Sequence, residues 1–189
     1  MKVIQLHQEE KQLILLAVEN NRQAQQQIYA KFSSKMLSVC RQYIKDIHHA
    51  EDVMITGFMK VFINLKKFEH KGSFEGWIRR IMIYECIDFL RVKKNNFNHQ
   101  DIEDVTISEN ESVYEMEDFS VDDIQNMIDN LPDGYKMVFN LYAIEGYKHQ
   151  EIAEMLQISE GTSKSQLSNA RKLLQQQIIE LKKKLNGTT

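Results

Sequence analysis

The chain has few of the residues that separate short strands and turns, with one proline and seven glycines in 189 residues. This scarcity favours a mostly helical protein over a sandwich or barrel. Only two cysteines occur, Cys40 and Cys86, without the CxxC spacing of a structural metal site. No apolar run approaches the ~18 residues of a membrane-spanning helix, and the start MKVIQLHQEEKQ is too charged for a secretion signal. We therefore expect a soluble, cytoplasmic protein with reduced thiols and no membrane insertion.

Charge is distributed unevenly along the chain, although the net charge is only −3. Residues 1–94 carry +6, residues 95–130 carry −11 without any lysine or arginine, and residues 131–189 carry +2. Two basic segments around an acidic one indicate a polyanionic partner for the flanks. The alternative is a solvated acidic linker between two ordinary domains.

Residues 1–94 are expected to form a first helical domain, because apolar residues recur there at helical spacing. Two helices joined near Asn20 and Asn21 come first, followed by a helix over 50–65 that Asp46 can cap. After a glycine-bearing loop over 68–73, Ser73 is placed to cap a helix that runs from Phe74 to about Lys94.

Residues 95–121 are polar and acidic and lack sustained periodicity, so we interpret them as a flexible linker. A second helical domain is expected over 122–189. Its predicted helices cover 122–130, a segment from Leu131 that ends at Gly146, 148–156 and 160–185. The short break at 157–159 between the last two helices predicts a helix-turn-helix.

In a helix-turn-helix that binds DNA, the first residues of the second helix reach base edges in the major groove. Here that stretch is 159–166. We expect Lys164 to contact phosphate or guanine and Gln166 to pair with adenine. Four more residues offer hydroxyl groups or positive charge to phosphates: Thr162, Ser165, Arg171 and Lys172. The alternative is an antiparallel helix pair with a solvated polar face.

The segment LPDGYKMVFNLYAIEGYKHQEIAEMLQISEGTSKSQLSNARKLL resembles region 4 of the bacterial RNA polymerase sigma factors of the sigma-70 family. The resemblance is closest to the small extracytoplasmic-function (ECF) group. AEDVMITGFMKVFINLKKF and GSFEGWIRRIMIYECIDFLRVKK resemble region 2 of the same group. The resemblance implies an all-helical, two-domain protein that binds core RNA polymerase and directs promoter recognition and transcription initiation. It implies no enzymatic activity, cofactor or small-molecule substrate, and it makes an anti-sigma factor a candidate partner.

The same resemblance assigns roles to the two halves. Region 4 would bind the −35 promoter element, and region 2 would bind the −10 element and the clamp helices of the largest polymerase subunit. The candidates for polymerase binding are Asp52, Ile55, Phe58, Met59 and Phe62. A base flipped out of the −10 element would be held by His70, Lys71 and Ser73. The strand backbone would be held by Arg79, Arg80, Arg91, Lys93 and Lys94.

The chain departs from the common family pattern at a few positions. Ile55 and Thr56 stand where Gln-Glu is common, and Tyr84 replaces a common asparagine. In the helix-turn-helix, Gln157 replaces the usual turn glycine and Ser163 replaces an aliphatic residue.

Two other functions remain open from the sequence. One is a stand-alone helix-turn-helix regulator that acts as a dimer on a palindrome. The other is a metal-dependent enzyme with an accessory DNA-binding module. Its metal ligands would come from His48, His49, Glu51 and Asp52 or from Asp122 and Asp123. His48 and Asp52 fit one turn of a solvated helix face better, and we expect no metal site.

Overall fold

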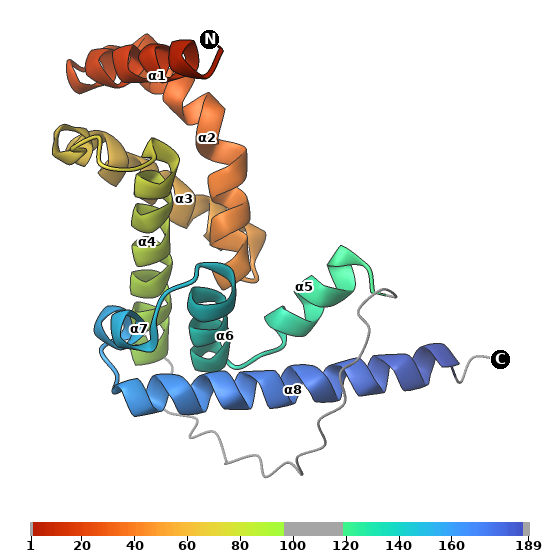
Figure 1. Cartoon of the computed structure of the whole chain (residues 1–189). Coiled ribbons are helices and arrows are strands. Elements are labelled where there is room, and N and C mark those ends of the chain that lie inside the picture. Colours follow the sequence, from red (N-terminus) through yellow and green to blue (C-terminus); the bar gives the residue numbers. More distant parts are fainter. Residues whose placement is uncertain (1, 97–118, 187–189) are drawn as a thin grey trace. The chain divides into compact units, whose positions relative to one another are not determined.

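The computed structural model describes residues 2–96 and 119–186, with side chains for 9–92 and 119–184. Within these ranges the chain forms helices, turns and loops and no strand, which confirms the predicted all-α class (Figure 1). The chain divides into two compact units, Met1–Arg91 and Val92–Thr189. Of the predicted linker over 95–121, residues 97–118 lie outside the described residues.

The first unit is built from α-helices whose starts are set by local capping. They are α1 (Lys2–Val18), α2 (Arg22–Tyr43), α3 (Ile47–Asn64) with the 3-10 turn η1 (Leu65–Lys67), and α4 (Phe74–Asn96). The side chains of Asn21, Asp46 and Ser73 each accept a backbone N–H three residues ahead, at 2.9 to 3.0 Å. Because a cap satisfies an N–H group that the helix itself leaves unpaired, these residues fix where α2, α3 and α4 begin. Helix α4 extends two residues into the predicted linker.

Helices α3 and α4 approach each other closely at Gly57. A Cβ atom at this position would overlap the Met82 sulfur, and Met82 is completely buried. Beside this contact, the Lys60 ammonium pairs with the Glu85 carboxylate at 2.5 Å. The absent side chain of Gly57 therefore allows the packing that fixes α3 against α4.

Both cysteines of the chain lie inside the first unit, as predicted. Cys40 on α2 and Cys86 on α4 have no exposed surface. The hydrogen bond between the two thiols and their burial raise the pKa of Cys86 well above its ordinary value. A thiol held in its neutral form is a poor nucleophile, so Cys86 serves the core rather than a reaction.

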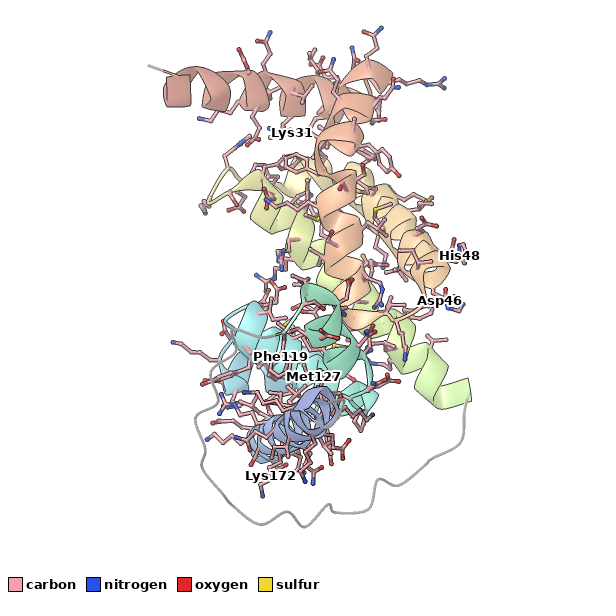
Figure 2. The ribbon with its side chains drawn as sticks, turned by 90° about the vertical axis from the view of Figure 1, so that its right-hand side faces the viewer. Lys31, Asp46, His48, Phe119, Met127 and Lys172 are labelled. Carbon is pink, nitrogen blue, oxygen red and sulfur yellow. The ribbon has the colours of Figure 1, made fainter. Side chains whose placement is uncertain are left out.

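The second unit packs three short helices on one long helix (Figure 1). The elements are α5 (Val121–Asp129), α6 (Asp133–Phe139), the π-helix η2 (Asn140–Ile144), α7 (His149–Leu156) and α8 (Glu160–Asn186). Leu131, Tyr135 and Ala170 form the centre of its core. Farther along α8, the Lys182 ammonium lies 5.7 Å from the Phe119 ring centroid, and Figure 2 shows Phe119 and Met127 beside this helix.

The helix predicted from Leu131 to Gly146 changes its hydrogen-bonding pattern halfway. At η2 the Glu145 N–H donates to the Asn140 carbonyl, five residues back, at 3.0 Å. Within this turn Leu141 is buried, whereas the neighbouring Tyr142 is half-exposed.

None of the described helices is long and apolar enough to cross a membrane. Among the residues that the structure describes, no group of three or more His, Cys, Asp or Glu side chains is arranged to hold a metal ion. Figure 2 shows Asp46 and His48 at the start of α3, where His48 instead pairs with Glu51 at 3.7 Å.

Candidate functional site

Helices α7 and α8 form the predicted helix-turn-helix. The turn between them passes through Gln157, whose φ of 57° is left-handed. This conformation costs a non-glycine residue about 1 kcal/mol, so the departure from glycine is accommodated rather than disruptive. Ser159 then caps α8, because its Oγ accepts the Thr162 N–H at 2.9 Å.

The start of α8 presents a polar surface. Its exposed residues are Glu160, Gly161, Lys164, Ser165, Ser168 and Arg171. The Lys164 ammonium lies 2.7 Å from the Glu160 carboxylate, and this hydrogen bond lowers the pKa of Glu160. Ser168 was not among the predicted residues, although its position between Lys164 and Arg171 places it on the same helix face.

Thr162 and Ser165, two of the predicted DNA-binding residues, form hydrogen bonds within α8 and its cap, and Gln166 packs against α6. The Thr162 hydroxyl lies 2.8 Å from the Ser159 hydroxyl, and the Ser165 hydroxyl donates to the Thr162 carbonyl at 3.0 Å. Gln166 is half-buried, and its side-chain nitrogen would lie 3.3 Å from a Cβ built on Gly134 in α6. Gln166 thus lies close to α6, and its predicted contact with adenine stays a prediction.

A chain of side-chain contacts links α7, η2 and α8. The Ser163 hydroxyl, completely buried, lies 2.9 Å from Nδ1 of His149. The His149 ring stacks on Tyr142, with centroids 4.6 Å apart and planes inclined by 22°. On the same tyrosine ring, the Arg171 guanidinium lies 5.7 Å from the centroid. Lys172, the next residue of α8, is half-buried (Figure 2).

In the first unit, α3 exposes a row of large apolar side chains. Ile55, Met59 and Ile63 are 50%, 60% and 75% exposed. Their spacing of four residues places them on one side of the helix, and we call them the α3 apolar surface. Large exposed apolar groups gathered in this way mark an interaction site. Ile63 was missed by the sequence reasoning, although it continues the spacing of Ile55 and Met59.

The other predicted polymerase-binding residues divide between surface and interior. Asp52 is exposed and Phe62 is half-buried. Phe58 is only 2% exposed and packs against Tyr29, with ring centroids 4.8 Å apart. Its ring is covered within the first unit, so the predicted direct contact of Phe58 with polymerase stays a prediction.

The loop before α4 is exposed and partly ordered by its own contacts. His70 has a left-handed φ of 58°, and its ring lies 4.8 Å from the Phe68 ring. The Lys71 ammonium pairs with Glu69 at 2.7 Å, and both side chains are largely exposed. Ser73 contributes its hydroxyl to the cap of α4, whereas the exposed His70 and Lys71 side chains contact residues of the loop itself.

The basic residues predicted to hold the −10 strand backbone lie along α4. Arg79 is half-buried, and the exposed Arg80 lies over the Tyr84 ring at 5.9 Å. Arg91 pairs with Asp88 at 3.2 Å. Lys93 and Lys94 lie in the final turns of the helix, and their side chains are outside the described residues.

The second unit thus has the architecture of a helix-turn-helix DNA-binding domain, and comparisons with known proteins extend this conclusion to the whole chain. The family model described as Sigma-70 region 2 matches residues 28–96, and that described as Sigma-70, region 4 matches residues 121–174. Together they cover more than half of the chain, in the order expected of one family. The protein belongs to the sigma-70 family of RNA polymerase sigma factors, in its ECF group.

Individual relatives agree with this assignment. The ECF RNA polymerase sigma factor SigW of Bacillus subtilis is 29% identical over 163 residues, which cover 79% of this chain and 86% of the relative. The ECF RNA polymerase sigma-E factor of Haemophilus influenzae is 24% identical and covers 82% of this chain and 87% of its own length. The sigma factor RpoE of Bartonella quintana, solved with the anti-sigma factor NepR, shares the fold with a TM-score of 0.53 and 21% identity, over 81% of this chain and 95% of that one.

The function follows from this membership. The protein is an alternative sigma factor, which associates with core RNA polymerase and directs promoter recognition and transcription initiation. Sigma factors are initiation factors, and the alternative of a stand-alone dimeric regulator is not favoured.

Proposed function

We propose that the two halves divide the tasks of this sigma factor. Residues 1–94 bind core polymerase and the −10 element, residues 122–189 bind the −35 element, and residues 95–121 connect them. The observation that carries this division is the polar, exposed start of α8 in one unit and the α3 apolar surface in the other. An apolar helix surface suits a protein partner, whereas a helix-turn-helix start suits the major groove.

The protein itself does no bond chemistry in this proposal. Polymerase forms the phosphodiester bonds, and the sigma factor acts in the cytoplasm by binding alone, without a cofactor. One structural relative is CnrH in complex with the cytosolic domain of CnrY, and another is RpoE in complex with the anti-sigma factor NepR. An anti-sigma factor is accordingly a candidate partner of this chain too.

Reconstituted transcription tests the proposal directly. Purified protein added to core polymerase is expected to produce a defined transcript that neither component makes alone, because promoter affinity requires both DNA-binding halves held on polymerase. The protein alone should bind the same promoter weakly. Tight binding to a palindrome as a dimer, without polymerase, would instead support the stand-alone regulator.

The loop before α4 gives a second test, on promoter melting. Extruding a base costs a few kcal/mol, so a loop that binds the flipped base lowers the cost of opening. We expect the double variant His70→Ala/Lys71→Ala to reduce transcription ~10-fold or more on duplex promoters and much less on templates with a pre-melted −10 bubble. Equal activity of the variant and the parent protein on duplex DNA would remove the loop from this role.

Ser73 requires separate treatment in that experiment. Because its hydroxyl accepts the Gly76 N–H at 3.0 Å, Ser73→Ala is expected to destabilise the start of α4 by about 1 kcal/mol. If Ser73→Ala alone impairs promoter opening, the loss of the α4 cap explains the defect without a contact between Ser73 and the flipped base.

A further inference from the structure

Arg171 differs from the other candidate DNA ligands of α8 in how its side chain is held. Lys164 is paired with a carboxylate of its own helix, whereas the Arg171 guanidinium lies on an aromatic ring from another segment. That ring, Tyr142, lies in the π-helical turn η2 and is half-exposed. On an aromatic face the guanidinium keeps its full charge and its N–H donors remain available at the rim of the ring.

The position of Tyr142 is fixed in turn by His149. The two rings are nearly parallel, and the His149 Nδ1 atom is tied to a hydroxyl inside the domain. A buried hydroxyl needs a hydrogen-bonding partner, and His149 is the partner that Ser163 has here. The serine that replaces an aliphatic residue in the recognition helix therefore sets the orientation of the histidine ring.

We propose that Tyr142 and His149 are positioning residues for promoter binding: Ser163 orients His149, His149 stacks on Tyr142, and Tyr142 holds the Arg171 guanidinium ready for a −35 phosphate. Neither ring touches DNA in this arrangement. The inference rests on the proposed function, in which Arg171 contacts the −35 element.

The first part of the test compares Arg171 and Tyr142 in the holoenzyme, formed from the full chain and core polymerase. Binding to promoter DNA is measured over a series of salt concentrations. Arg171→Ala should weaken binding and reduce the slope of log K against log salt by ~1, as expected when one phosphate contact is lost. Tyr142→Leu removes the ring but not the charge, so it should weaken binding ~3-fold to 5-fold with a smaller change in slope.

The double variant Tyr142→Leu/Arg171→Ala separates positioning from a general structural effect. If the ring acts through the guanidinium, Tyr142→Leu should cause no further loss once Arg171 is absent. If the two losses instead add, the ring acts on its own and the proposal is overturned. If Arg171→Ala leaves DNA affinity unchanged, Arg171 does not contact DNA. If Arg171→Ala weakens DNA binding but Tyr142→Leu does not, Arg171 contacts DNA and the positioning role of Tyr142 is overturned.

The second part of the test concerns His149. His149→Ala should weaken DNA binding as Tyr142→Leu does, and Gln150→Ala, an exposed neighbour on α7, serves as the matched control. His149→Phe keeps the stacked ring but leaves the Ser163 hydroxyl unpaired. Combining it with Ser163→Val removes that hydroxyl, and the pair should restore DNA affinity to within about two-fold of the parent protein. Failure of this rescue in a variant with a normal unfolding transition would contradict the stacking role.

Discussion

Met59→Glu/Ile63→Glu is expected to prevent assembly with core polymerase while leaving the first unit folded. Both side chains belong to the α3 apolar surface and are at least 60% exposed, so their replacement removes little from the core. At a protein interface, central apolar anchors are often worth 2 kcal/mol or more each, and burying an unpaired carboxylate adds a further penalty. We expect the affinity for core polymerase to fall at least ~100-fold, as measured by titration of labelled protein.

A matched control comes from the same unit. Leu15 and Leu16 on α1 are 60% and 40% exposed, so Leu15→Glu/Leu16→Glu introduces the same charges at a different apolar site. This control should leave polymerase affinity nearly unchanged. Circular dichroism should show the parent helical content for both double variants. Normal polymerase binding by the α3 variant would overturn the assignment of this surface.

Gly57→Leu is expected to destabilise the first unit strongly, because α3 and α4 leave no space for a side chain there. Even the first carbon would overlap the buried Met82 sulfur. Overpacking of a filled core costs typically 1–3 kcal/mol, well above the 0.5–1 kcal/mol that a helix gains when glycine is replaced. Trp77, the only tryptophan of the chain, lies in this unit, so its fluorescence follows unfolding by denaturant without a contribution from the other half.

The control is Thr56→Leu, on the exposed side of α3 next to Gly57. It should shift the unfolding midpoint little. Met82→Ala alone should also destabilise the unit, since it leaves a cavity. The combination Gly57→Leu/Met82→Ala should be more stable than the sum of the two losses predicts, because the added side chain fills that cavity. Equal midpoints for Gly57→Leu and Thr56→Leu would show that the two helices can separate without cost.

Features that depend on neighbouring residues could be predicted from the sequence. Asp46 and Ser73 cap their helices as expected, since a cap needs only a side chain and a backbone N–H three residues away. The helix-turn-helix was predicted for the same reason. The short polar break between its two helices and the helical spacing of apolar residues on either side all lie in one continuous stretch of sequence.

Features that depend on distant partners could not be predicted in this way. Helical spacing identifies a broad apolar face, but the elements that pack on it decide which edge is covered. On α3 the covered edge includes Phe58, which packs on Tyr29, and the uncovered edge includes Ile63. Likewise, the approach of Gln166 to Gly134 joins two different helices, so the spacing within either helix does not reveal it.

Because Cys40 and Cys86 are buried, their reactivity toward a thiol reagent can be used to measure opening of the first unit. These are the only two thiols of the chain, and both are sealed in the folded state. Modification by a thiol reagent therefore requires the surrounding helices to separate, and under conditions of rapid reclosing its rate measures the population of the opened form. A cysteine introduced at an exposed position such as Lys183 would react at once, so a fluorophore could be attached there selectively. The slower modification of Cys40 and Cys86 would then report how often the first unit opens.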